Sequence, residues 1–100
     1  MNDQGARPAV EVRHNAAESR FEAALGSQLA VCDYRRSGSV LLMPHTWVPA
    51  QYEGRGIAAA LVEAALAWAR AQGLKVQPAC SYVAGYMRRH PETQDLLATR

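Results

Sequence analysis

The chain has 100 residues, of which 49% are hydrophobic and 20% are charged, enough to build the core of one ordinary globular domain. Eleven basic and nine acidic residues give a formal net charge of +2, and they are scattered apart from the short pairs Arg35-Arg36 and Arg88-Arg89. This distribution argues against a nucleic-acid-binding protein. No apolar run is long enough to cross a bilayer, and residues 1–9 lack the hydrophobic centre of a secretory signal, so we expect a cytoplasmic protein without membrane contact.

The two cysteines, Cys32 and Cys80, lie 48 positions apart. The sequence has no C-x-x-C motif and no histidine pair at the spacing of metal ligands, so we expect no metal site. In a reducing compartment both cysteines should be free thiols. For the oligomeric state we expect a monomer or a weak dimer.

The N-terminal third of the chain predicts a disordered lead-in and two strands. Residues 1–9 are polar and are interpreted as the lead-in, followed by a single domain over residues 10–100. Residues 10–14 alternate between apolar and polar, which is typical of a half-exposed strand. Residues 20–25 fit a strand or a turn of helix, and the Gly26-Ser27 pair that follows favours a strand hairpin.

Two more strands are predicted on either side of a turn at residues 36–39. Residues 28–35 alternate between two faces: Leu29, Val31 and Asp33 on one, and Ala30, Cys32 and Tyr34 on the other. Residues 40–48 are the most apolar stretch and carry apolar side chains on both faces, which indicates a central strand. Pro44 cannot donate to a strand ladder, so it predicts a bulge or a bond-free edge that would splay the sheet.

The second half of the chain predicts a strand between two helices. Residues 55–72 are rich in alanine and repeat large apolar residues every three to four positions, and Gly73 ends this long helix. Residues 74–77 form a short strand, which should lie parallel to the central strand through a right-handed crossover. A shorter helix over residues 80–90 and a short helical or frayed tail complete the chain.

The turn between the central strand and the long helix predicts an anion-binding cradle. Gly54 and Gly56 let the backbone approach a ligand closely. The first amides of the following helix have no carbonyl partner within the helix and point outward. A diphosphate group suits such a site.

This order of elements, together with the glycine turn, resembles the GNAT superfamily of acyl-CoA-dependent N-acetyltransferases over roughly residues 10–97. The superfamily's pyrophosphate motif is Q/R-x-x-G-x-G/A, followed by an apolar pair. Two registers match it: Gln51-x-x-Gly54-x-Gly56 and Glu53-x-x-Gly56-x-Ala58. We prefer the second, because it places Leu61-Val62 where the apolar pair belongs, although Glu53 then replaces the usual Gln or Arg.

Four stretches are similar to the short, single-domain YjdJ-type branch of this superfamily: residues 45–49, 53–58, 76–83 and 89–91. The resemblance implies a minimal GNAT fold of the α/β (α+β) class. This fold has a mostly antiparallel sheet of about five strands with one parallel crossover pair, one long helix and one shorter helix. The chain lacks the extra elements with which larger relatives build an acceptor groove, so an open acceptor side is implied.

The resemblance also implies acetyl-CoA as cofactor and a set of binding residues. The pantetheine arm would lie along the backbone of the central strand at Thr46, Trp47 and Val48. The pyrophosphate would lie against the turn and helix start at Glu53, Gly54, Arg55, Gly56, Ile57 and Ala58, with Arg55 supplying compensating charge. Arg88 and Arg89 could reach the 3′-phosphate of the coenzyme, or could be solvated surface residues.

Three side chains are candidates for catalysis. Cys80, at the start of the last helix, could carry an acyl group, protonate the leaving thiolate or be a small buried residue. Tyr86 lies close to where many GNAT enzymes keep a tyrosine as general acid, and Tyr82 competes for that role. His45 could act as general base for an attacking amine or simply bond a neighbour.

We therefore predict an acetyl-CoA-dependent N-acetyltransferase that moves the acetyl group to a primary amine by direct attack. The acceptor could be a small molecule or a protein lysine. An acyl-Cys80 intermediate is the alternative mechanism. A non-catalytic CoA-binding or protein-interaction module is the alternative function, and a weakly basic nucleic-acid binder is disfavoured by the scattered charge.

Overall fold

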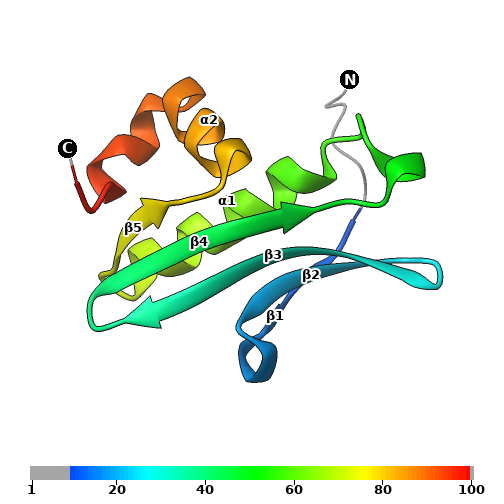
Figure 1. The fold of residues 1–100 in the computed structure, drawn as a ribbon, viewed down its shortest axis with the longest axis horizontal. Helices are drawn as coiled ribbons and strands as arrows, with labels where there is room; N and C mark the ends of the chain where they lie inside the picture. Colours follow the sequence, from blue (N-terminus) through cyan, green and yellow to red (C-terminus); the bar gives the residue numbers. More distant parts are fainter. Residues whose placement is uncertain (1–9, 100) are drawn as a thin grey trace.

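The computed structural model describes residues 10–99, so the lead-in predicted over residues 1–9 lies outside the described residues. Five strands form one sheet in the order β1-β2-β3-β4-β5 (Figure 1). The strands are β1 (Val12–Asn15), β2 (Arg20–Leu25), β3 (Gln28–Ser37), β4 (Val40–Trp47) and β5 (Lys75–Pro78). The helices are α1 (Ile57–Ala71) and α2 (Ser81–Arg89), with the short 3-10 helices η1 (Ala16–Glu18), η2 (Ala50–Tyr52) and η3 (Pro91–Leu96).

The sheet combines an antiparallel meander with one parallel pair. Strands β1 to β4 pair antiparallel in sequence order, and β5 pairs parallel to β4 after the crossover through α1. The predicted α/β fold, with its parallel crossover pair and its long and shorter helix, is confirmed. Among the described residues, no helix is both long enough and apolar enough to cross a membrane.

The ends of the elements differ from the sequence-based prediction by a few residues, for local reasons. The first strand begins at Val12 and continues to Asn15, whose side chain then caps η1 by accepting a hydrogen bond from the Glu18 amide at 3.1 Å. The third strand continues to Ser37, so the turn is shorter than predicted. Helix α1 begins two residues later than predicted, because Gly56 has a φ of 81°, which a helical residue cannot adopt.

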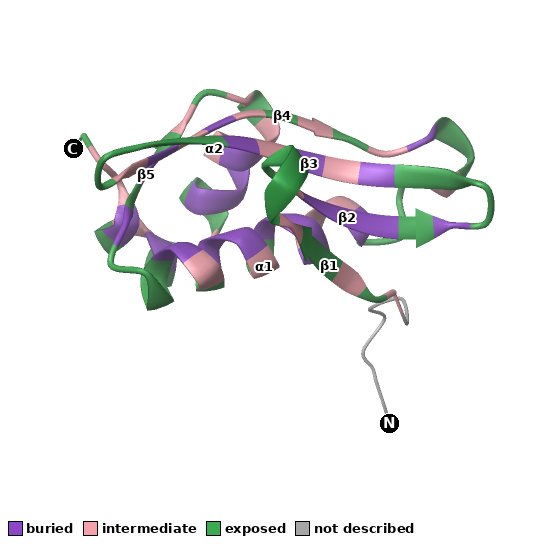
Figure 2. Ribbon diagram, turned by 90° about the horizontal axis from the view of Figure 1, so that it is seen from below, coloured by how far each residue is buried: buried purple, intermediate pink, exposed green. Residues whose placement is uncertain are grey.

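The two α-helices, α1 and α2, lie on the same side of the sheet (Figure 2). The core between them and the sheet consists of buried side chains from each layer: Phe21, Ala23, Leu41 and Met43 from the sheet, Leu61, Val62 and Ala65 from α1, and Val83 and Met87 from α2. Helix α1 is also held by Trp68, whose ring lies edge-on to that of His14 at 4.6 Å. On the opposite face of the sheet, Leu29 and Trp47 remain exposed.

Strand β4 separates from β5 halfway along its length. The parallel register runs from Val40 opposite Lys75 to Met43 opposite Pro78 and ends there. At the same point, Met43 and Pro44 of β4 together face the single residue Tyr34 of β3, so the bulge predicted at Pro44 is present. The Met43 carbonyl then accepts hydrogen bonds from the amides of the two residues that follow β5. Beyond this point β4 has no strand partner on its β5 side among residues 10–99.

Candidate functional site

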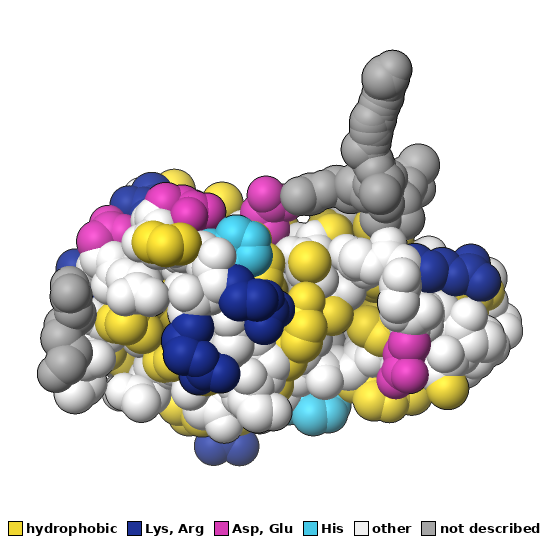
Figure 3. Space-filling view, turned by 90° about the horizontal axis from the view of Figure 1, so that it is seen from above, with side chains coloured by type: hydrophobic (Ala, Val, Ile, Leu, Met, Phe, Trp, Pro, Cys, Tyr) yellow, Lys and Arg dark blue, Asp and Glu magenta, His cyan; other side chains and the backbone are white. Residues whose placement is uncertain are grey.

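The separation of β4 from β5 opens into a cavity of about 350 Å³. Its lining comes from β4, the loop that includes η2, the start of α1 and the first turn of α2: Thr46, Val48, Tyr52, Glu53, Gly54, Gly56, Ile57, Ala58, Ala59 and Tyr82. Figure 3 views the molecule from this side and shows a strip of hydrophobic side chains with basic side chains gathered beside it. The cavity therefore joins the glycine turn to the open edge of β4.

The start of α1 supplies unpaired backbone donors to this cavity. Gly56 is the N-cap residue, and the first hydrogen bond of the helix runs from the Ala60 amide to the Gly56 carbonyl at 3.0 Å. The amides of residues 57–59 consequently have no partner within the helix. Gly54 and Gly56 have φ angles of 80° and 81°, which favour glycine strongly. Free amides beside a glycine N-cap are the features that an anion cradle requires, and the cradle itself stays a prediction.

Of the two charged residues in the turn, one lines the cavity and the other lies beside it. Glu53 lines the cavity, while the Arg55 guanidinium lies over the ring of Tyr52, 5.2 Å from its centre. Arg55 itself lines a neighbouring hollow beside β1, and among residues 10–99 only Tyr52 and Ile57 line both spaces. The compensating charge predicted for Arg55 thus lies next to the cavity and not inside it.

Cys80 lies at the point where the strands separate, and Thr46 links it to Cys32. The Cys80 thiol donates to the Thr46 hydroxyl over 3.7 Å, and that hydroxyl donates to the Cys32 sulfur over 3.8 Å. Burial raises the pKa of Cys80, but the Val83 amide, the Thr46 hydroxyl and the Tyr82 amide outweigh it, so the pKa lies below its ordinary value. Burial raises the pKa of Cys32 to about 11. Of the two thiols, Cys80 is thus the one whose surroundings favour the thiolate, while the buried Cys32 belongs to the core.

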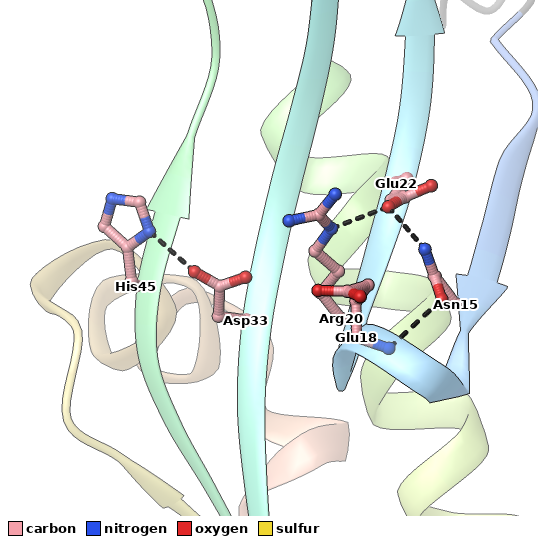
Figure 4. A network of polar contacts seen from close by, with 6 residues as sticks. All are labelled: Asn15, Glu18, Arg20, Glu22, Asp33 and His45. Carbon is pink, nitrogen blue, oxygen red and sulfur yellow. Dashed lines mark hydrogen bonds and ion pairs between the residues drawn. The ribbon is translucent and has the colours of Figure 1, made fainter.

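His45 lies on the opposite face of the sheet from this cavity and pairs with Asp33 across β3 and β4 (Figure 4). Its Nδ1 lies 2.9 Å from Asp33 Oδ2, and both side chains are exposed to solvent. A carboxylate only accepts hydrogen bonds, so Nδ1 donates, and in the neutral imidazole Nε2 then carries the free lone pair. Figure 4 shows a second polar group on the same face, in which Glu22 accepts from Arg20 and Asn15.

The structure does not bring all the predicted residues together. Tyr86 is buried, its ring stacks on His90 with 3.9 Å between centres, and it lines a different hollow between α1 and η3. Tyr82, the competing tyrosine, lines the cavity. Trp47 is 47% exposed, and its side chain does not line the cavity.

One protein family, described as GCN5-related N-acetyl-transferase, has a sequence pattern that matches residues 20–96. The match spans most of the chain and includes each element that lines the cavity. The chain belongs to the GCN5-related N-acetyltransferase (GNAT) family. The resemblance inferred from the glycine turn and the order of elements is thus confirmed.

Individual GNAT relatives agree with this assignment. The protein NATD1 of Gallus gallus is 33% identical over 90 residues, which cover 87% of this chain and 82% of the relative. The NATD1 proteins of Mus musculus and Homo sapiens show the same identity over 90 residues and are covered to 82% and 80%. The NMR solution structure of a Staphylococcus aureus protein described as GCN5-like has a TM-score of 0.71 at 24% identity, covering 87% of this chain and 86% of that one. This last match supports the GNAT fold.

Three residues of the candidate site were not among those predicted from the sequence. Tyr52 and Ala59 line the cavity, and Asp33 holds His45. Ala59 is the third helical residue after Gly56, so helix geometry could have identified it as a donor of a free amide. Asp33 carries no motif, and its pairing with His45 depends on the strand register.

Proposed function

We propose that the chain is an acetyl-CoA-dependent N-acetyltransferase that moves the acetyl group to a primary amine by direct attack. The observation that carries this proposal is the continuous cavity between the free amides of α1 and the separated edge of β4. A long ligand with a diphosphate in its middle and a thioester at one end matches this shape. When bound, acetyl-CoA supplies an acetyl group activated as a thioester.

The residues of the cavity fit the two parts of such a coenzyme. The amides of residues 57–59 would donate to the pyrophosphate, and the glycine at the N-cap leaves room for that approach. The β4 backbone at Thr46 to Val48 has no strand partner on its β5 side among the described residues, so it can bond an extended pantetheine arm as an added strand. Glu53 is unfavourable beside a diphosphate, but the cradle acts through backbone amides.

At the thioester end, Cys80 and Thr46 lie where the sulfur of the coenzyme would be released. A thiol with a lowered pKa is a better proton donor to a leaving thiolate than an ordinary cysteine. The Thr46 backbone amide also contributes to that lowered pKa, so it points toward the thiol. The same amide can stabilise the oxyanion that forms as the amine attacks.

We assign to His45 the role of general base for the amine. Asp33 holds its Nδ1, which leaves Nε2 free to accept the proton that the ammonium group of the acceptor loses. The side chain lies on the open face of the sheet, so the acceptor would approach from that face and reach the thioester around the free edge of β4. Once the amine has added to the thioester carbonyl, the C–S bond would break, and Cys80 would give its proton to the released sulfur.

Calorimetry with acetyl-CoA, followed by transfer assays with a panel of primary amines and lysine peptides, tests the proposal. We expect binding, transfer, and a loss of transfer of about 100-fold or more in His45→Gln with little change in coenzyme affinity. Absence of both heat and thermal shift at millimolar acetyl-CoA would refute coenzyme binding. Binding without transfer to any amine would favour a coenzyme-binding module over an enzyme.

The lowered pKa of Cys80 also supports the alternative mechanism with an acylated cysteine. Mass spectrometry of the protein after incubation with acetyl-CoA separates the two routes. Direct attack predicts no acetylated Cys80 that forms and decays at the rate of transfer. A peptide that carries one acetyl group on Cys80 and loses it when an amine is added would instead establish the covalent route.

A further inference from the structure

A second hollow, of about 550 Å³, lies on the open face of the sheet beside His45. Its lining includes Glu18 at the end of η1, Asp33 and Arg35 from β3, and His45 from β4. Figure 4 shows Glu18, Asp33 and His45 on this face. Because β3 separates β4 from β2, which follows η1, and neighbouring strands are roughly 4.8 Å apart, the hollow extends across about 10 Å of the sheet. It therefore has His45 at one end and Glu18 at the other.

Two charged groups of this hollow are not paired with a side chain of the described chain. Within residues 10–99, Arg35 takes part in no ion pair and no side-chain hydrogen bond. Glu18 bonds there through its backbone amide and not through its carboxylate. The nearby Arg20 is held by Glu22 at 2.6 Å, so these two charges offset each other. Arg35 and Glu18, which are both exposed, are thus open to a negative and a positive group of a ligand.

The charges of the hollow indicate which acceptor fits it. Glu18 and Asp33 each carry a negative charge and Arg35 carries a positive one, so with His45 neutral the hollow has one negative charge in excess. A free diamino acid has the complementary pattern of two ammonium groups and one carboxylate. A diamine has no carboxylate for Arg35. A lysine inside a protein chain has neither a free α-ammonium group nor a free α-carboxylate.

We propose that this hollow binds a free diamino acid and presents its side-chain amine to His45. This inference rests on the proposed acetyltransferase function, whose acceptor it names. Arg35 donates to the α-carboxylate, and Glu18 accepts from the α-ammonium group. The aliphatic stem then crosses β3 toward β4. The four-carbon stem of lysine suits the roughly 10 Å between η1 and β4, which the Glu18 and His45 side chains shorten from either end.

This orientation directs acetyl transfer to the side-chain nitrogen. The ω-ammonium group loses two protons: His45 takes one, and the other balances the proton that the sulfur of the coenzyme gains. The N–C bond forms and the C–S bond breaks. Glu18 keeps the α-amine protonated, and an ammonium group has no lone pair with which to attack. The product is therefore the diamino acid acetylated on its side chain.

NMR titration of the isotope-labelled protein with L-lysine, without coenzyme, tests the hollow separately from acetyl transfer. We expect saturable shifts of the amides around the hollow, and binding about fivefold tighter than that of cadaverine, which is lysine without the carboxylate. Arg35→Gln should abolish this preference. Arg36→Gln removes the same charge from the next position of β3, which does not line the hollow, and should keep the preference.

A second pair of ligands tests the other charged group. Nα-acetyl-L-lysine lacks the α-ammonium group, so it should bind about fivefold more weakly than L-lysine to the parent and equally well to Glu18→Gln. With acetyl-CoA added, mass spectrometry of the product should place the acetyl group on the side-chain nitrogen. Acetylation of the α-nitrogen would overturn the proposed orientation.

The remaining outcomes separate this inference from the proposed function. Equal binding of L-lysine and cadaverine to the parent, or a preference that survives Arg35→Gln, would refute the diamino-acid site. Absence of L-lysine binding, with transfer to another amine, would refute that site and leave the proposed function intact. Saturable L-lysine binding in the hollow without any binding of acetyl-CoA would support the site and refute the proposed function.

Discussion

Alanine substitutions at three glycines test the anion cradle and also decide its register. Gly54, Gly56 and Gly73 have φ angles of 80°, 81° and 71°. An alanine in this left-handed region costs roughly 1–2 kcal/mol of folding free energy. For a domain of this size, such a loss lowers Tm by about 5–10 °C. All three variants should lose stability to this extent, because the backbone strain is the same at each position.

Coenzyme binding should separate the three variants. At Gly54 and Gly73 an added Cβ meets no atom within 4 Å, so backbone strain is the only cost. Gly56 caps the helix whose free amides would bond the pyrophosphate, so we expect a Cβ there to obstruct the ligand. Losing one or two charge-assisted hydrogen bonds of roughly 1.5–3 kcal/mol each weakens acetyl-CoA binding at least tenfold. Gly73→Ala, at the far end of α1, is the matched control.

Isothermal calorimetry below the lowest Tm of the series measures these affinities with every variant folded. If Gly54→Ala loses binding and Gly56→Ala keeps it, the motif begins at Gln51 and not at Glu53. If all three variants lose stability equally and still bind acetyl-CoA like the parent, the glycine cradle is refuted.

The remaining predictions concern three other side chains. Thr46→Val removes the hydroxyl that favours the Cys80 thiolate, so the pKa of Cys80 should rise. The pH profile of Cys80 alkylation by iodoacetamide should then shift to higher pH. An unchanged profile would contradict an effect of the Thr46 hydroxyl on this thiol. Asp33→Asn should slow acetyl transfer about tenfold without changing coenzyme affinity, because His45 loses its orienting partner; unaltered turnover would exclude His45 as an oriented base. Gly85→Ala should raise the free energy of unfolding by about 0.5–1 kcal/mol through helix propensity, because an added Cβ meets only the flexible ends of Arg88 and Arg89; chemical unfolding curves measure the effect, and a lower free energy of unfolding would contradict it.

The order and type of the elements could be predicted because each carries its own local signal. Alternation marks the strands, the alanine-rich repeat marks α1, and Gly73 ends it. The choice between Tyr82 and Tyr86 could not be made in this way. The two residues are one turn apart and lie on nearly the same side of α2, so small rotations of the helix decide which one is buried. Packing of Tyr86 into the core settles that rotation.

Contacts between residues that lie far apart in the chain could not be predicted from the sequence, for a different reason. Asp33 and His45 meet only because β3 and β4 are paired in one particular register. The hydrophobic pattern and the turn constrain that register, but the shift at the bulge beside Pro44 decides which side chains of the two strands meet beyond it. The same dependence hides the approach of Thr46 to Cys32 and Cys80.

The bulge at Pro44 decides which residues of β4 point toward the helices and which point to the open face of the sheet. Leu41 and Met43 point toward the helices, and uninterrupted alternation would send His45 the same way and Thr46 outward. The extra residue at the bulge reverses this order, so that Thr46 reaches the thiols and His45 reaches Asp33. Odd and even positions of β4 thereby exchange sides, and one added residue places the thiols and His45 on opposite faces of the sheet. Removing one residue at this position would direct Thr46 to the open face of the sheet and His45 toward the helices, while the amino-acid composition of β4 stayed almost the same.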